Sequence, residues 1–476
     1  MASNLPDYVA SAQPVPLANR VPWFKSTAQT YAGIMLWFVF WQDVPTAGGS
    51  PGGALAQGLG VALVGLVVAA LLCHFLYYLV PGMLGMKTGL PLYIVGTSSY
   101  GVIGGFLMPG FLMGLLQFGW LGVNACFSAA FLVKPFYPDK TLMEVISTPP
   151  HIVVAILWAA AGAFMGLKGI QYVAKVATFL PLIPLVILII LVFGSVGGVA
   201  SFDPAEPIAA SEAGVPLTTW GVFAIILTYV IGFFATAGAA GTDFGMNNRN
   251  AKDVQLGGLV GIAGAKIFAG GLALLIVAGA HGLGKASIPT MMNPTELMYD
   301  LFGLNVGAIF MYLLAIAAFP PACFSAFIAA NSFKTTLPKV NPFITVGIGT
   351  VVSIILAATG LAAQVIEVFS VIGASFGPVC GAMAADYLLA GRRWAGPRAG
   401  FNPAGWISWI VGFIVGAFNL VAGLFEATQA YSNLVPVPPL AAFVVGFVLY
   451  YVLAKAGMES KTLEMPEALA AEPTEA

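Results

Sequence analysis

The sequence contains very little charge. Only 8% of its 476 residues are Asp, Glu, Lys or Arg, whereas soluble domains carry roughly 25% of these residues. Because 59% of the residues are hydrophobic, a soluble globular protein is excluded and we expect an integral membrane protein in contact with the lipid bilayer. The formal net charge of −1 lacks the basic excess that nucleic-acid binding requires, so no nucleic-acid partner is expected.

Cysteine and histidine are also scarce. The four cysteines and three histidines show no metal-ligand spacing, so we expect no metal site and no cofactor. The apolar segments lack a paired His/Asp/Glu or Cys/His set, which argues against a membrane enzyme. They also lack a repeated ring of pore-lining groups, which argues against a channel. No obligate protein partner is indicated.

Long apolar segments fill the chain instead. A membrane-spanning helix needs about 20 predominantly apolar residues. Suitable stretches fall near 28–47, 55–80, 101–132, 151–167, 171–198, 218–241, 255–281, 303–331, 342–362, 365–389, 404–426 and 434–455. The sequence therefore predicts an all-α integral membrane protein with about twelve transmembrane helices.

The polar ends and the loop charges predict the topology. We expect a cytoplasmic N-terminal segment at 1–26, a twelve-helix domain at 27–457 and a disordered acidic cytoplasmic tail at 458–476. With the N-terminus inside, fourteen of the 18 Lys and Arg residues are cytoplasmic, three are outside, and Lys266 lies within a span. This bias predicts a multi-pass protein of the plasma (inner) membrane with both termini cytoplasmic. No apolar core follows Met1 closely, so no cleaved signal peptide is expected.

Glycines interrupt two spans at corresponding places in the two halves of the chain. The first span, YAGIMLWFVFWQDVPTAGG, contains Gly33, and the sixth, YVIGFFATAGAAGTDFG, contains Gly232, Gly238 and Gly241. Such spans are typical of the discontinuous helices of inverted-repeat transporters, whose substrate site lies at the bilayer midplane. Glycine also permits close helix packing, so the glycines alone leave both interpretations open.

Two polar side chains and an indole occur in the middle of the third span. Gln117, Trp120 and Asn124 stand at positions i, i+3 and i+7, which share one helix face. A glutamine amide both donates and accepts hydrogen bonds, so it can pair with the edge of a planar amide-like ring. Trp120 offers a flat face for stacking. Asn124 is expected to bond within the helix bundle.

Further aromatic and hydroxyl groups are predicted at the same depth. Phe234 and Thr236 lie near the break of the sixth span, and Trp37 lies near the equivalent point of the first. This combination fits a flat heteroaromatic solute. It provides no charge for the carboxylate or ammonium of an amino acid, although a broken helix end could bind either through backbone groups. An amino-acid or amine carrier therefore remains an alternative.

Four stretches resemble motifs of the nucleobase:cation symporter-1 family, in particular its cytosine permease branch. They are QFGWLGV, TAGAAGTDFGMNNRNAK, GAMAADYLLAGRR and VPGMLGMKTGL, and the resemblance runs from about residue 14 to 455. It implies a core of two inverted five-helix repeats with discontinuous helices 1 and 6. It also implies alternating access to a central site for a nucleobase.

The resemblance implies a role for each candidate residue. Gln117 would bond the base edge, Trp120 would stack on one face of the base, and Phe234 would close the other face. Three further residues are implied to lie at the same pocket, namely Thr236, Trp37 and Phe38.

The coupling ion stays open between Na⁺ and H⁺. In family members that use sodium, first-helix carbonyls, here Gly33 and Leu36, act with eighth-helix hydroxyls. The corresponding eighth-helix positions here are Ile316 and Ala317, whose side chains offer no oxygen to a hard cation. The following Pro320-Pro321 pair is expected to break the helix locally and free backbone carbonyls.

Proton coupling would need a titratable group inside the membrane. Asp43 is the best candidate, because it follows the aromatic run of the first span, which borders the expected site. The eighth helix also lacks the asparagine that often contacts the base in this family, which leaves the identity of the heterocycle open.

The sequence as a whole predicts a secondary active transporter. We expect a symporter that imports a nucleobase or related planar heterocycle, such as cytosine, a purine, a hydantoin or a pyrimidine vitamin precursor. An amino-acid or amine carrier of the same fold is the first alternative, and an integral-membrane enzyme is the second.

Overall fold

Eleven of the twelve expected spans are helical in the computed structural model. The structure describes residues 5–25, 34, 37, 44–169, 171–172, 175, 179–180, 182–212 and 214–465. Within these ranges, ten helical segments are long and apolar enough to cross a membrane, and α20 (Pro342–Ala358) is a shorter apolar helix of 17 residues. Most of the first expected span, 28–47, lies outside the described residues.

The spans follow the predicted order. They are α4–η4–α5 (Leu59–Leu72, Cys73–Tyr78, Leu79–Thr88), η5–α8–η6 (Phe106–Phe111, Leu112–Val133, Lys134–Phe136), α10 (Pro149–Lys168), α12–η7 (Leu182–Ser195, Val196–Ser201), α14 (Thr219–Ala239), α16–η8–α17 (Ala251–Leu256, Gly257–Gly264, Ala265–Gly282), α19 (Leu304–Thr336), α20, α21 (Val365–Leu389), α22 (Pro403–Gly423) and α23 (Pro438–Lys455). Short helices connect them, including α1 (Asp7–Ala10), α6 (Leu92–Val95), α7 (Thr97–Tyr100), α9 (Leu142–Val145), α13 (Ala205–Ala209), α15 (Gly241–Gly245) and α18 (Pro294–Phe302). The bounds agree with the hydropathy-based expectation to within a few residues at most ends.

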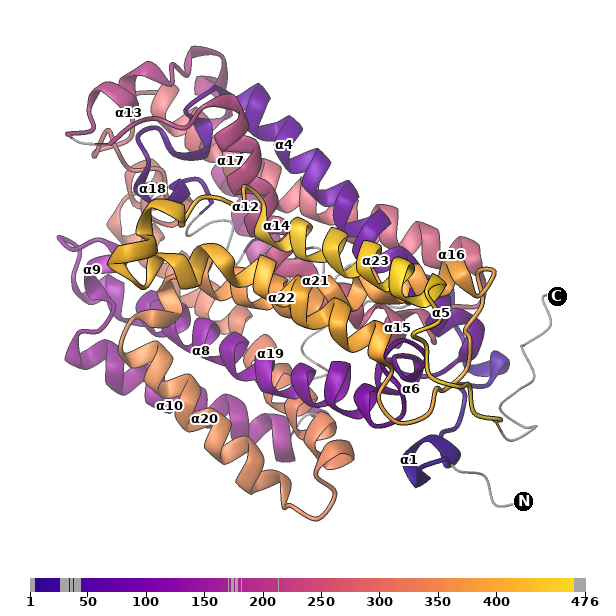
Figure 1. Ribbon diagram of the computed structural model, residues 1–476. Helices are drawn as coiled ribbons and strands as arrows, with labels where there is room; N and C mark the ends of the chain where they lie inside the picture. Colours follow the sequence, from indigo (N-terminus) through magenta and orange to yellow (C-terminus); the bar gives the residue numbers. More distant parts are fainter. Residues whose placement is uncertain are drawn as a thin grey trace.

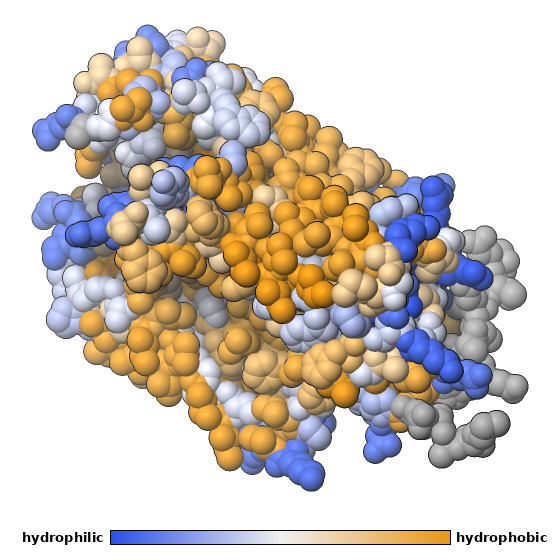
Figure 2. Space-filling model, viewed as in Figure 1, coloured by the Kyte–Doolittle hydropathy of each residue, from blue (hydrophilic) through white to orange (hydrophobic). Residues whose placement is uncertain are grey.

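The long helices run between two ends of the molecule (Figure 1). One end gathers α1, α5, α6, α15, α16 and the last turn of α23, and the other holds α9, α13 and α18. Figure 2 shows apolar side chains over the middle of the visible face and hydrophilic side chains at both ends. This banding is expected of a protein whose middle is surrounded by lipid.

Two helices form the centre of the bundle. The most apolar stretch of α14 is 78% buried and that of α21 is 83% buried, whereas those of α10, α12 and α22 are only 33% buried. α14 packs between α4 and α21, and α8 packs against α10, α19 and α20. The helices that carry Gln117 and Phe234 are therefore held by neighbours within the protein.

Gly232 allows α14 and α21 to come close together. A Cβ atom at this position would lie 2.7 Å from the carbonyl oxygen of Phe369 on α21. Gly238 is similarly placed against η4, where a Cβ would lie 2.7 Å from the Cβ of Tyr77. These two glycines therefore serve close packing. The break in the sixth span comes later, where α14 ends at Ala239 and α15 begins at Gly241.

The eighth helix does not break at its two prolines. α19 continues through Pro320 and Pro321, so the expected local break was wrong. Proline has no N–H group, so the carbonyls four residues earlier lose their helical partners. Asn124 supports α19 at this place, because its Nδ2 donates to the carbonyl of Ala318 at 2.8 Å. Its Oδ1 accepts from Trp158 Nε1 at 3.0 Å, so Asn124 bonds within the bundle as expected.

The packing at Gly232 can be tested by adding one methyl group. Gly232→Ala would push α14 away from α21 and should destabilise the protein by about 1–3 kcal/mol, as overpacking does. Gly221→Ala in the same helix is the matched control, because its Cβ would meet its nearest atoms at an ordinary 3.4 Å. Thermal melting of the purified variants should lower the Tm for Gly232→Ala only. An equal Tm for both variants would contradict the close approach.

Candidate substrate site

A cavity of about 1350 Å³ opens among the central helices. Its inner part is lined by residues of α8, α14 and α19, and its outer part by the N-terminal segment, α6 and α15. It extends from Asn124 in the middle of α8 to Gln13 and Phe24 near the chain start, and to Lys334 near the end of α19. The cavity therefore connects the middle of the bundle with the end that carries α1.

Gln117 lies in the wall of this cavity. Its side chain is only 6% exposed. Among the described residues its amide makes one weak contact, from Nε2 to the sulfur of Met113 at 3.6 Å. A buried amide usually has stronger hydrogen-bonding partners. Gln117 can therefore offer both a donor and an acceptor to a molecule in the cavity.

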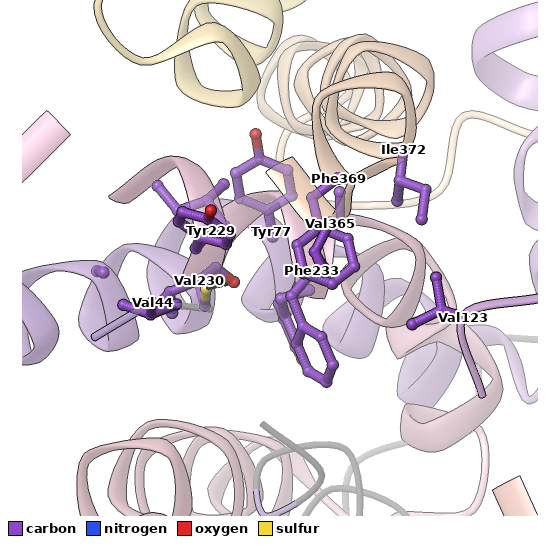
Figure 3. Packing of buried hydrophobic residues seen from close by; sticks show 14 of the residues in the cluster. Val44, Tyr77, Val123, Tyr229, Val230, Phe233, Val365, Phe369 and Ile372 are labelled. Carbon is purple, nitrogen blue, oxygen red and sulfur yellow. Dashed lines mark hydrogen bonds between the residues drawn. The ribbon is translucent and has the colours of Figure 1, made fainter. Parts of the chain in front are cut away.

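Trp120 and two phenyl rings form an aromatic wall beside Gln117. The ring centroid of Trp120 lies 5.2 Å from that of Phe233 on α14, nearly perpendicular to it, and 5.3 Å from that of Phe369 on α21. Phe233 and Phe369 also meet edge to face at 5.8 Å, and Figure 3 shows the two residues close together. Trp120 and Phe233 line the cavity, while Phe369 is fully buried behind them.

The structure assigns Phe234 to a different place from the one expected. Phe234 is fully buried and is not among the cavity-lining residues. Its ring instead lies against Lys266, whose Nζ is 3.9 Å from the ring centroid. Neighbouring residues on a helix point about 100° apart, so one rotation of α14 brings only one of the two phenyl rings to the cavity. The aromatic residue of α14 at the cavity is Phe233.

Thr236 lies at the cavity, whereas Trp37 does not. Thr236 lines the cavity and is 6% exposed, so it lies beside Gln117 and Trp120 as expected. Trp37 is buried with 1% exposure and does not contribute to the lining. Phe38, the second expected first-helix residue, lies outside the described residues.

The candidate cation ligands are not brought together in the described part of the chain. The side chain of Ile316 is 49% exposed on the outside of α19. Ala317 is buried but does not line the cavity. Neither position faces the cavity, and their side chains offer no oxygen to a cation. Gly33, Leu36 and the proton-coupling candidate Asp43 lie outside the described residues.

Sequence reasoning missed the polar face of α19. Ser325, Asn331 and Ser332 line the cavity, about two to four turns beyond the positions that the motif comparison selected. Ser325 and Ser332 are seven residues apart and share one helix face, and this spacing in SAFIAANS was the available signal. Ser332 also ties α19 to the entry of the third span, because its hydroxyl donates to the carbonyl of Gly110.

Asp243 is a further polar residue of the lining that was not selected. It lies on α15, and its Oδ1 accepts a hydrogen bond from the backbone N–H of Leu92, the first residue of α6, at 3.3 Å. Burial raises the pKa of Asp243 to about 6, and the Leu92 N–H only partly opposes this shift. Asp243 therefore links α15 to α6 through a carboxyl group that titrates just below neutral pH.

Residues 20–423 match the family model for permeases of cytosine/purines, uracil, thiamine and allantoin. Cytosine permeases of Escherichia coli K12 and O157:H7 are each 28% identical to this chain, over 362 and 359 residues respectively. These alignments cover 72% of this chain and 74% of each permease.

Solved structures of Mhp1 share the fold over nearly the whole chain. The inward-facing structure of Mhp1 aligns with a TM-score of 0.63 at 15% identity and covers 99% of this chain and 97% of Mhp1. The closed structure of Mhp1, described as a nucleobase-cation-symport-1 family transporter with bromovinylhydantoin bound, aligns with a TM-score of 0.62 at 16% identity. It covers 97% of this chain and 98% of that one.

The raised pKa of Asp243 predicts a pH-dependent stability. The folded protein binds this proton more tightly than the unfolded chain, whose Asp pKa is near 3.8. Protonation of Asp243 therefore stabilises the folded state fully at low pH, and this stabilisation is lost as the pH rises through about 6. Asp243→Asn keeps an acceptor for the Leu92 N–H but cannot ionise. The Tm of the wild type should therefore fall relative to that of Asp243→Asn between pH 5 and pH 7. Parallel Tm curves for the two proteins across this range would contradict the assignment.

Proposed function

Because this chain belongs to the family of permeases for cytosine/purines, uracil, thiamine and allantoin, we propose that it imports a planar nitrogen heterocycle by cation symport. The protein is a multi-pass permease of the nucleobase type and not an enzyme. The observation that carries the finer proposal is the weakly bonded amide of Gln117, which lies one helical turn from the indole of Trp120 in the wall of a central cavity.

Gln117 would recognise the edge of the ring. Its Nε2 donates and its Oε1 accepts, which matches the alternating acceptor and donor groups along the edge of a nucleobase or hydantoin. Two hydrogen bonds to a side chain that is only 6% exposed discriminate strongly, because a ring without these groups leaves the buried amide unpaired. The hydroxyl group of Thr236 and the side chains of Ser325 and Asn331 offer further polar contacts from the facing helices.

Trp120 and Phe233 would provide the stacking surface. Phe369 supports the indole from α21, which limits its movement when a ring packs against its cavity side. Base stacking on an aromatic side chain contributes about 1–3 kcal/mol per base and tolerates different rings. The aromatic wall would therefore supply affinity, while Gln117 supplies selectivity for the edge.

The charges of the lining favour a neutral solute over an amino acid. Among the described lining residues the charged side chains are Asp243 on α15 and Lys334 near the end of α19, and neither belongs to the central part of α8 or α14. An amino acid would need partners for both its carboxylate and its ammonium group. The amino-acid or amine carrier is therefore the less favoured function.

We further propose that the end of the molecule with α1 faces the cytoplasm of an inner membrane. The excess of Lys and Arg in the loops assigned to this side supports this orientation. The cavity extends toward this end, so it would release solute inward. A coupling cation, Na⁺ or H⁺, would drive uptake. The cation and the solute together would favour the occluded state more strongly than either does alone.

A ligand screen tests the substrate class. Purified protein should gain thermal stability with at least one planar heterocycle from a panel of cytosine, uracil, hypoxanthine, allantoin and hydantoin, and none with leucine, because binding to the folded state raises the Tm. The screen is run in NaCl and in choline chloride, at pH 6 and pH 7.5, so that it also reports the coupling ion. Stabilisation by leucine alone would favour the amino-acid carrier.

The role of Gln117 can be tested with the best heterocycle of that screen. Gln117→Leu should weaken its binding about ten- to a hundredfold, because two hydrogen bonds to a buried side chain are lost. Gln255→Leu is the matched control, because Gln255 is exposed on α16, away from the cavity lining. Unchanged binding by Gln117→Leu would remove Gln117 from the site while leaving the family assignment intact.

A further inference from the structure

Lys266 is a lysine buried in the middle of the seventh span. It follows the first residue of α17, and its side chain is completely shielded from solvent. Its Nζ lies 3.4 Å from the sulfur of Cys73 and 3.5 Å from the backbone carbonyl oxygen of Val230. None of the ion pairs formed among the described residues includes Lys266. A cation at this depth is costly, so its presence calls for a function.

Most of the contacts of this ammonium are with α14. Besides the Val230 carbonyl, the Nζ lies 3.9 Å from the ring centroid of Phe234 and 5.5 Å from that of Phe233. Val230 and Phe234 are four residues apart and therefore share one face of α14. A cation over a desolvated aromatic face is attracted by the ring quadrupole. Lys266 therefore holds the face of α14 that includes Val230 and Phe234.

A different face of α14 borders the cavity. Phe233, Thr236 and Ala237 line it, and their spacing of three and four residues places them on a second face of α14. Because a helix rotates as a unit, the rotation that directs Phe234 to Lys266 also directs Phe233 to Trp120. The two faces cannot be set independently.

Two π-helical turns adjoin the contact between Lys266 and Cys73. The π-helical turn η8 ends directly before α17, and the π-helical turn η4 begins at Cys73. A π-helical turn shifts the face that the following residues present, and such turns are frequent at functional sites. Lys266 follows one of these turns, and Cys73 is the first residue of the other.

We propose that Lys266 is a positioning residue for ring recognition: its ammonium group fixes the rotation of α14 that presents Phe233 and Thr236 to the cavity. The inference rests on the proposed function in one respect only, the identity of the cavity as the solute site. The rotation of α14 can be measured without any solute.

Cysteine labelling reports this rotation. Ala237→Cys places a thiol on the cavity face, and Ala235→Cys places one at a position that is fully buried. The four native cysteines are also buried, so the parent protein provides a low background. With N-ethylmaleimide, Ala237→Cys should react much faster than Ala235→Cys in the otherwise wild-type protein.

Removing the ammonium should reduce this difference. Adding Lys266→Met should lower the ratio of the two labelling rates by about fivefold or more, because the desolvated cation–π contact no longer selects one rotation. Phe234→Leu removes the ring instead of the charge and should act in the same way. Lys266→Arg keeps a cation and should restore most of the ratio.

The control is Lys455→Met. Lys455 ends α23 and lies 5.9 Å from the ring of Tyr451, so the variant loses a similar contact away from α14 and should leave the ratio unchanged. A ratio in folded Lys266→Met within twofold of the wild-type value would overturn the proposal. Should Lys266→Met fail to fold, Phe234→Leu decides the question by the same criterion.

Uptake of radiolabelled cytosine separates this proposal from the proposed function. If the wild type takes up cytosine, Lys266→Met should raise KM about five- to thirtyfold with little change in Vmax, because the ring surface is misplaced. A changed Vmax with an unchanged KM would contradict a positioning role. If the wild type transports no heterocycle, the proposed function fails, while the labelling ratio still decides whether Lys266 sets the rotation of α14.

Discussion

Polar groups inside a bilayer have no water to bind, so each one must find a partner within the protein or face a cavity. This constraint separates the polar residues of the bundle into two kinds. Asn124 and His151 have strong partners, since Asn124 bonds Ala318 and Trp158, and a ring nitrogen of His151 lies 2.9 Å from the carbonyl of Cys126. Gln117 has only a weak contact to sulfur. This difference supports the proposal that Gln117 binds the solute.

The same constraint explains the polar cluster at the end of α21. The carboxylate of Asp386 accepts hydrogen bonds from Arg398, Tyr450 and Ser98. Arg398 also forms an ion pair with Glu459 at 2.7 Å, just beyond α23. Because every strong donor in this cluster has an acceptor, the charges can be buried where α7, α21 and α23 meet. The GAMAADYLLAGRR stretch that contains Asp386 therefore has a structural role in this protein, whatever else it contributes.

Hydropathy predicted the spans well because each helix must bury about the same length of apolar chain in the membrane. The helical spacing of Gln117 and Trp120 placed them on one face of α8, and Thr236 was selected by its position near the break of the sixth span; all three line the cavity. Local spacing could not decide between Phe233 and Phe234. That choice depends on the rotation of α14, which is set by contacts with residues distant in the sequence, including Phe369 and Lys266.

The cavity-facing side of the eighth helix was not predicted for a related reason. Comparing motifs selected Ile316 and Ala317, but a helix face is defined by its phase relative to its neighbours. The contact of Asn124 with Ala318 and that of Ser332 with Gly110 fix this phase. They direct Ser325 and Asn331 to the cavity and leave Ile316 on the outside. Such contacts join residues about 200 positions apart, and no local pattern contains them.

These constraints meet on α14. On one side, Gly232 lets the helix approach Phe369 so closely that a methyl group would not fit. On another, the ammonium of Lys266 holds Phe234 and the Val230 carbonyl. Between these two contacts, both the distance of α14 from α21 and its rotation are restricted, so Phe233 can meet Trp120 edge to face at 5.2 Å. A transporter must let such a helix move during its cycle, and a contact made by one cation with a carbonyl and an aromatic face can be exchanged more readily than interlocked apolar packing.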